Sequence, residues 1–328
     1  MYDVVTFGSA TRDILVKPKT AVARDGFCLP VGAKVEIDNL VLSSGGGGTN
    51  TAATFAKQGF FTAFCGMVGD DLAGAAIIEE LKKLGVGAGM VKKNANKATN
   101  HSIVLAPEGI DRTILVWRGA SDFLQKKDIP WQAIKESRWF YLAPFAKTLS
   151  NMTGTLINFA HKNKIKIAMN PGYDQLSFPE KKIAGMLKKV DVLIINREEA
   201  GKLTGINHQN EEDIFRKLDE MAGGIVIMTK GKEGAVASDG QYLYRAPILE
   251  KKVVDRTGAG DSFGSGFVAG LIHEKGNIEK ALQLAVANSA FCLSKSGAKE
   301  GLLIKGQKYA RVKIGRQQCQ GTKYCKIK

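Results

Sequence analysis

Residues 255–263 read Asp-Arg-Thr-Gly-Ala-Gly-Asp-Ser-Phe, and this stretch decides how the rest of the chain is interpreted. Gly258, Ala259 and Gly260 carry almost no side chain, so the backbone N–H groups of this turn are accessible. The small residues that follow predict a helix from about Gly260 to His273. N–H groups at a helix N-terminus lack intrahelical acceptors and, together with the helix dipole, favour an anion. The stretch therefore predicts an anion site on the first turn of a long helix.

Asp261 lies on the first turn of that helix, beside the anion site, and the residues alone allow two roles for it. Its carboxylate could accept the proton of a hydroxyl that attacks a phosphoryl group, while the N–H groups stabilise the charge of the transition state. Aspartate is also a common helix-capping residue. The pattern of this turn leaves both roles open.

Outward from this turn, short apolar runs alternate with segments of helical periodicity. The predicted strands are Val4–Phe7, Thr62–Val68, Trp139–Leu142, Ile165–Met169, Val192–Ile195 and Ile225–Thr229. The predicted helices are Thr49–Gln58, Leu72–Leu84, Thr153–His161, Gly260–His273 and Ile278–Ser294. This alternation indicates an α/β fold with a Rossmann-like, doubly wound, mostly parallel sheet that is covered on both faces.

Two stretches, 13–43 and 99–118, break this rhythm because apolar and polar residues alternate in them without a helix between. We expect them to form a small, mostly antiparallel β-sheet lid over the cleft, with Gly109 in a hairpin turn. Two ordinary surface hairpins are the alternative. An exposed lid sheet has an apolar face that needs cover, so we expect two lids to pair in a homodimer. The remaining chain divides into a main α/β domain of residues 1–12, 44–98 and 119–306 and a basic C-terminal tail of residues 307–328.

Six short motifs occur in order along the chain. They are Gly8–Asp13 at the end of the first strand, Gly45–Ala53, Gly66–Asp71, Asn196–Ala200, Thr229–Gly234 and Asp255–Asp261. These motifs resemble, in order and spacing, those of the ribokinase-like (PfkB-type) carbohydrate kinases. The resemblance spans residues 4 to about 302, nearly the whole chain. It implies an ATP-dependent kinase that phosphorylates a hydroxyl of a small sugar or sugar acid.

The resemblance also assigns catalytic roles. Asp261 would be the base that deprotonates the acceptor hydroxyl, and Gly258, Ala259 and Gly260 would form the anion hole. Asn196 and Glu199 would order Mg²⁺ and its waters near the ATP phosphates. Without the resemblance, a strand end followed by a helix cap is the simpler interpretation of this pair.

Further residues are implied at the nucleotide and at a monovalent cation. The residues implied for ATP are Asn196, Lys230, Gly231, Gly234, Thr257 and Asn288. Asn288 could instead be a polar residue on a solvated helix face. Backbone oxygens of Asp255 and Thr257, with the loop 294–297, would bind K⁺, although Arg256 departs from the threonine that is commoner there.

The acceptor side is predicted from the same resemblance. Asp13 would accept hydrogen bonds from substrate hydroxyls, although it could also be a turn residue. Gly45, Gly46 and Asn50 would approach the substrate by backbone and amide groups. Arg118 could bind a carboxylate in bidentate fashion or be an exposed arginine at a strand end.

A nucleoside kinase of the same fold remains an alternative. A nucleoside usually needs an aromatic or apolar stacking surface in the lid. The residues that could supply one are Trp117, Phe27 and His101.

Composition limits the remaining classes. The net charge is +15, but ten Lys and Arg against one acidic residue lie from Lys295 onward. A solvated basic tail accounts for this excess, and a non-catalytic nucleic-acid-binding protein is the alternative from another class. The five cysteines have no zinc-type spacing, and no apolar stretch reaches the roughly 18 residues of a membrane span. We therefore expect a cytoplasmic protein without membrane contact.

Overall fold

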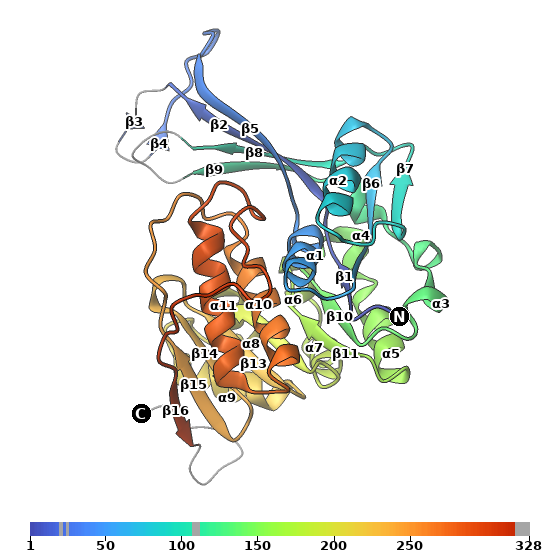
Figure 1. Cartoon of the computed structure of the whole chain (residues 1–328), viewed down its shortest axis with the longest axis vertical. Helices are drawn as coiled ribbons and strands as arrows, with labels where there is room; N and C mark the ends of the chain where they lie inside the picture. The colour runs from blue at the N-terminus through green and yellow to red at the C-terminus, as the bar shows by residue number, and fades with distance from the viewer. Residues whose placement is uncertain (20–21, 24–25, 107–111, 319–328) are drawn as a thin grey trace.

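The computed structural model describes residues 1–19, 22–23, 26–106 and 112–318, and it is built around one ten-stranded sheet (Figure 1). The strands in spatial order are β16 (Gly315–Gln318), β15 (Tyr242–Ala246), β14 (Ala235–Ser238), β13 (Ile225–Thr229), β12 (Val192–Asn196), β11 (Lys166–Met169), β10 (Trp139–Leu142), β1 (Val4–Phe7), β6 (Thr62–Gly69) and β7 (Val91–Asn94). The seven neighbouring strands β13, β12, β11, β10, β1, β6 and β7 pair in parallel, whereas β14, β15 and β16 extend the sheet in antiparallel fashion. The doubly wound, mostly parallel sheet predicted from the sequence is confirmed.

Helices cover both faces of this sheet. One face packs against α5 (Thr153–Lys162), α7 (Glu180–Leu187), α8 (Arg197–Thr204) and α9 (Glu211–Met221). The other packs against α1 (Gly47–Lys57), α10 (Ala259–His273) and α11 (Ile278–Leu293). Helix α2 (Leu72–Lys83) covers the end of the sheet beside β6. The shorter helices are α3 (Trp131–Ile134), α4 (Lys147–Ser150), α6 (Tyr173–Leu176), η1 (Ala120–Phe123), η2 (Lys126–Asp128) and η3 (Gly231–Glu233).

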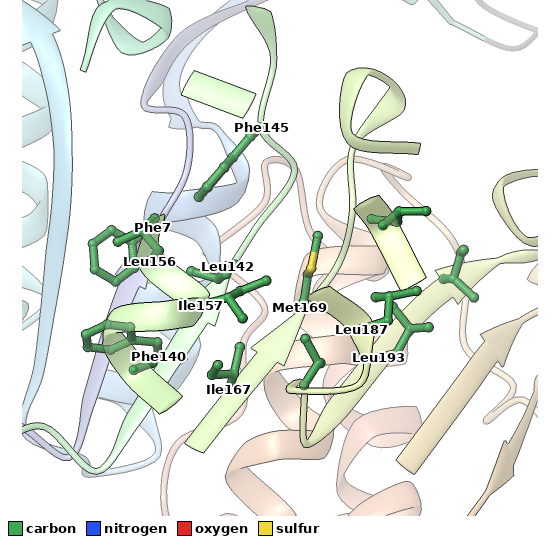
Figure 2. Packing of buried hydrophobic residues seen from close by; sticks show 14 of the residues in the cluster. Phe7, Phe140, Leu142, Phe145, Leu156, Ile157, Ile167, Met169, Leu187 and Leu193 are labelled. Atoms are coloured by element: carbon green, nitrogen blue, oxygen red, sulfur yellow. The ribbon is translucent and has the colours of Figure 1, made fainter. Parts of the chain in front are cut away.

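The two cores follow from the alternation of side chains along each strand. Phe140 and Leu142 of β10 point into the core under α5 and α7, as Figure 2 shows, whereas Trp139 and Tyr141 point into the core under α10. Because the central strands are buried on both faces, they are continuous apolar runs. This is why the sequence could predict β1, β10 and β13 with the bounds that the structure has.

A separate four-stranded sheet projects from this body and combines two distant segments. Its strands in order are β5 (Ile37–Gly45), β2 (Thr11–Pro18), β8 (Asn100–Leu105) and β9 (Thr113–Trp117). The outer pairs are antiparallel and β2 pairs with β8 in parallel, so the predicted smaller, mostly antiparallel sheet is confirmed. Two very short strands, β3 (Val22–Ala23) and β4 (Gly26–Phe27), form a hairpin, and Gly109 lies outside the described residues.

Strand pairing gives the small sheet two different faces. The inner face carries Asp13, which pairs with Ser43 and Ser102. The outer face is apolar and exposed, and it is defined here by Leu40, Leu42, Ile103, Leu115 and Trp117.

The C-terminal segment up to Gln318 is not the solvated tail that the sequence suggested. Strand β16 pairs with the edge strand β15, and Arg316 lies over the Tyr242 ring at 3.8 Å. Tyr309, Val312 and Ile314 pack, partly buried, against the core under α10 and α11. An open sheet edge offers unpaired backbone groups, which explains why a polar segment without periodicity can dock there. Among the described residues, no helix combines the length and apolar content that a bilayer span requires.

Candidate active site

Two helix N-termini converge on Asp261. Helix α10 starts at Ala259 and helix α1 at Gly47, and the two helices pack against each other. The Asn50 Nδ2 donates a hydrogen bond of 2.8 Å to Asp261 Oδ2. A methyl group on Gly47 would lie 3.3 Å from Asp261 Oδ1, so a glycine allows the close approach. The structure therefore brings Asp261, Asn50 and both glycine-rich turns together.

The Asp261 carboxyl has the environment of a proton acceptor. Enclosure by protein raises its pKa above the ordinary value, whereas the Asn50 hydrogen bond and the Lys299 ammonium oppose that rise. The residue is half-buried rather than closed off from solvent. A carboxylate that is weakly solvated, oriented by an amide and still accessible can accept a hydroxyl proton.

The turn before α10, which the sequence predicts to bind an anion, is held in shape by Asp255. Gly258 has φ 77°, and a methyl group there would lie 2.6 Å from the Ala298 Cβ. The buried Asp255 carboxylate accepts hydrogen bonds from Thr257 N (2.9 Å), Thr257 Oγ1 (2.7 Å) and Gly297 N (2.9 Å). It thereby joins the turn before α10 to the loop after α11. The first N–H groups of α10 then point away from the helix with no intrahelical acceptor.

Asp13 lies opposite, on the inner face of the small sheet. Its side chain is buried, hydrogen bonds with Ser102, and packs so tightly against Gly45 that a methyl group there would overlap it. Burial raises the pKa of Asp13 to about 6, although the Lys299 ammonium opposes the shift. No donor in the described part of the chain reaches the buried Asn50 Oδ1. Asp13 and Asn50 thus present oxygen acceptors that suit the hydroxyl groups of a substrate.

The raised pKa of Asp13 predicts that acceptor binding depends on pH. The ionised carboxylate accepts more hydrogen bonds than the acid, so acceptor affinity should be present above pH 6 and lost as the pH falls through about 6. We expect the KM for the acceptor to rise about tenfold per pH unit below that value, while the KM for ATP changes little. Asp13→Asn should raise the acceptor KM about 100-fold and remove this pH limb. Steady-state kinetics from pH 5 to 8 measures both effects, and an unchanged KM in the variant would contradict the assignment.

The Asp13 carboxyl should change the stability of the folded chain with pH in the opposite direction to its effect on acceptor binding. The carboxyl binds its proton more tightly in the folded chain, so its contribution to stability grows as the pH falls from 6 toward the unfolded pKa of 3.8. At pH 7.5 Asp13→Asn should therefore melt no lower than the parent. Asp219→Asn is the matched control, because burial also raises the pKa of Asp219 to about 6 and its hydrogen bond goes to Ser238, on β14. That variant should leave the acceptor KM unchanged.

Other predicted lid residues lie elsewhere. His101 pairs with both Trp117 and Arg12, so His101 and Trp117 lie on the face opposite Asp13 and do not offer a stacking surface on the Asp13 side. The reason is strand alternation, which separates neighbours onto two faces. Arg118 is exposed, and its charge opposes the burial-driven rise in the pKa of Asp122. The side chain of Phe27 lies outside the described residues.

Asn196 and Glu199 form a reciprocal helix cap at the start of α8. Asn196 Oδ1 accepts from Glu199 N at 2.8 Å, and Glu199 Oε2 accepts from Asn196 N at 3.0 Å. This capping box is the simpler interpretation that the sequence allowed. Burial also raises the pKa of the Glu199 carboxyl. A half-buried carboxylate and an amide oxygen at the carboxyl end of β12 fit an indirect, water-mediated Mg²⁺ site, because a cation would offset the cost of partly burying the charge.

Three of the residues predicted to bind ATP, Lys230, Gly231 and Gly234, have a structural role within the protein. Lys230 Nζ donates to Glu211 Oε2 at 2.7 Å, which occupies its charge within the protein. Gly231 and Gly234 both have positive φ, and a methyl group at Gly234 would overlap the Ala246 carbonyl oxygen. The turn geometry therefore accounts for both glycines.

The structure does not support the predicted nucleotide contact of Asn288. Its side chain is fully buried, Nδ2 donates to Ser262 O at 2.8 Å, and Oδ1 accepts from Leu303 N at 2.9 Å. It ties the first turns of α10 to α11 and to the segment that follows. Because the core holds both ends of this amide, the predicted adenine contact is wrong.

The sequence analysis missed two positively charged side chains near the site, Lys299 and Arg112. Lys299 is buried beside Ser44 and Glu80, and Arg112 Nη1 lies 4.0 Å from Asp255 Oδ1. Lys299 follows Gly297 by two residues, in a loop that the motifs already placed at the site, so its proximity was the available signal. Arg112 comes from the small sheet, which gave no such signal.

The Asp13 carboxyl, the Asn50 amide oxygen, the Asp261 carboxyl and the N-terminus of α10, on a doubly wound sheet, fit a phosphotransferase that uses an alcohol group as acceptor. The pfkB family carbohydrate kinase profile matches residues 1–305, and the chain belongs to that family. A ribokinase of Lactococcus lactis is 29% identical over 92% of this chain and 94% of its own. A nucleoside kinase of Methanothermobacter thermautotrophicus is 24% identical over 81% of this chain and 84% of its own.

The fold comparison agrees. A putative ribokinase II from E. coli, solved in complex with ATP and Mg²⁺, superposes with a TM-score of 0.78 at 20% identity. The match covers 92% of this chain and 96% of the other. The chain is thus an ATP-dependent phosphotransferase.

Proposed function

We propose that the protein transfers the γ-phosphoryl group of ATP to a hydroxyl of a small sugar or sugar acid. The observation that best supports this proposal is the Asn50–Asp261 hydrogen bond of 2.8 Å, which orients a carboxylate where two helix N-termini converge. Asp261 takes the proton as the acceptor oxygen bonds to the γ-phosphorus and the bond to the β-phosphate oxygen breaks. The N–H groups of Gly258, Ala259 and Gly260 stabilise the charge on the transferred group, and ADP leaves.

Acceptor recognition follows from the groups opposite the base. Asp13 and Asn50 Oδ1 accept bonds from substrate hydroxyls, and the Gly45 and Gly46 backbone approaches the sugar closely. For a sugar acid, the exposed Arg118 is the proposed carboxylate partner. In this proposal the small sheet, segments 13–43 and 99–118, acts as a lid on the remaining domain.

Two cations complete the proposal. Asn196 and Glu199 would hold Mg²⁺ through waters, and the ion would neutralise negative charge on the ATP phosphates. The backbone of Asp255 and Thr257, joined to the 294–297 loop by the Asp255–Gly297 hydrogen bond of 2.9 Å, is the proposed K⁺ site.

The test is ADP release from Mg-ATP across sugars, sugar acids, sugar phosphates and nucleosides, with and without K⁺. Turnover of a sugar or sugar acid supports the proposal. Turnover of a nucleoside keeps Asp261 as the base and overturns the acceptor class. Salt-sensitive binding of DNA or RNA without any turnover favours a nucleic-acid-binding protein.

We also propose that the apolar outer face of the small sheet pairs two chains in a homodimer. Leu42 and Leu115 are 54% and 52% exposed on this face. Leu115→Lys should shift light scattering from the dimer toward the monomer, because a buried unpaired charge is costly. Val116→Lys is the matched control, since Val116 is 59% exposed but lies on the inner face of the same strand. A parent chain that stays monomeric at all concentrations refutes the pairing.

A further inference from the structure

Lys299 is a buried ammonium that joins three parts of the chain. Its side chain is 4% exposed. The Nζ donates to Ser44 O at 2.6 Å and to Ser44 Oγ at 2.7 Å, and it lies 3.6 Å from Glu80 Oε1. Ser44 Oγ in turn donates to Glu80 Oε1 at 2.6 Å. The loop after α11, the end of β5 and helix α2 therefore meet at one charge.

This charge sits at the start of the acceptor-binding turn. Ser44 directly precedes Gly45, which packs against the Asp13 carboxylate. The Gly45 carbonyl accepts from Thr49 Oγ1 at 2.7 Å, so the Ser44 and Gly45 carbonyls are both held. The lysine backbone is anchored as well, because Lys57 Nζ donates to Lys299 O at 2.6 Å. The ammonium thus fixes the peptide that positions Gly45 against Asp13.

Lys299 also interacts electrostatically with both active-site carboxylates. Asp13 and Asp261 are among the three anions that stabilise its charge, with Glu80 the strongest. The other polar or charged groups around Asp13 are Ser102, Asp255 and Arg12, and those around Asp261 are Asn50, Tyr141 and Cys292. A buried ammonium is costly unless anions surround it, and these anions belong to the reaction site.

We propose that Lys299 is a positioning residue of the phosphoryl transfer, which holds the Ser44–Gly45 peptide in place against Asp13 and supplies a buried positive charge to the Asp13 and Asp261 carboxylates. The inference rests on the proposed function for its catalytic meaning, although its electrostatic part does not require turnover. It assigns a function to a lysine that carries no reacting atom. The ammonium acts through the two aspartates, so its loss should affect the acceptor rather than ATP.

The kinetic test uses Lys299→Met, which keeps the aliphatic chain and removes the charge. We expect the acid limb of kcat/KM for the acceptor to move up by about one pH unit, because a neighbouring cation no longer favours the ionised carboxylates. The acceptor KM should rise about tenfold, with the KM for ATP within about twofold. Lys305→Met, at an exposed lysine, is the control and should match the parent. Equal losses for both substrates with an unmoved acid limb would overturn the inference.

A second variant separates charge from packing. Glu80→Gln removes an anion beside the same ammonium, so it should move the acid limb down, opposite to Lys299→Met. A purely structural network would give losses without this reversal. If Lys299→Met does not fold, the direction of the shift in Glu80→Gln decides alone.

A third readout needs no acceptor. The carboxyl carbons of Asp13 and Asp261 can be titrated by ¹³C NMR in the full chain, assigned with Asp13→Asn and Asp261→Asn. Both titrations should move to higher pH in Lys299→Met or to lower pH in Glu80→Gln. Unchanged titrations in both variants would refute this inference. If the variants show these shifts but the parent enzyme turns over no acceptor, only the proposed function is refuted.

Discussion

Asp261→Asn is expected to lower kcat by about 10³-fold while leaving ATP binding and the fold intact. An amide cannot take the hydroxyl proton, so the attacking oxygen must lose it to water without an oriented base. The side chain keeps its size, and its Oδ1 can still accept the hydrogen bond from Asn50 Nδ2. Removal of a carboxyl whose pKa is raised by burial should not destabilise the chain at neutral pH.

Three measurements make this prediction decisive. Single-turnover kinetics reports the chemical step, calorimetric titration reports ATP affinity, and thermal unfolding reports the fold. Asp219→Asn serves as the reference for removing a buried, high-pKa carboxyl away from the site, and it should keep its turnover. A near-normal rate in Asp261→Asn would remove the base assignment and leave the residue as a helix-terminal aspartate.

Gly258→Ala is expected to lower kcat by about 100-fold and to destabilise the chain. Gly258 has φ 77°, a region that costs an L-residue roughly 1–2 kcal/mol, and its new methyl group would meet the Ala298 Cβ at 2.6 Å. Relief of that contact has to shift the turn before α10 or the loop after α11. Either shift moves the N–H groups away from the transferred phosphoryl group.

Gly85→Ala supplies the matched control. Gly85 has φ 75°, and a methyl group there meets nothing within 4 Å. It follows α2, at Leu84–Gly85, away from Asp261. Both variants should lose stability in denaturant unfolding because both positions have positive φ, with the larger loss in Gly258→Ala from the Ala298 contact, but only Gly258→Ala should lose turnover. Equal kcat values in the two variants would show that the turn is not an anion hole.

The predicted parts of this fold were those with a local signal. Buried parallel strands such as β10 are apolar runs, and amphipathic helices such as α2 repeat every third or fourth residue. Strands β7 and β16 were missed because Val91–Asn94 and Gly315–Gln318 are polar and mostly exposed. An edge strand is specified by the neighbour that it pairs with, and a sequence does not display that neighbour.

The site divides in the same way. The glycine-rich turns were predictable because Gly46 and Gly258 have a positive φ that favours glycine, and Asp261 follows Gly258 in the same short motif. Lys299 contacts Ser44 and Glu80, more than 200 residues earlier, so its role depends on a three-dimensional contact. Asn288 showed the opposite error, since its polar side chain suggested a ligand but bonds inside the core.

The docking of β16 on β15 also has a consequence for biosynthesis. Helices α10 and α11 separate β15 from β16 in the sequence, so a nascent chain exposes the edge of β15 until β16 has been synthesised. During that interval the open edge can pair with a strand of another molecule and aggregate. Expression variants truncated before Gly315 would make that exposure permanent.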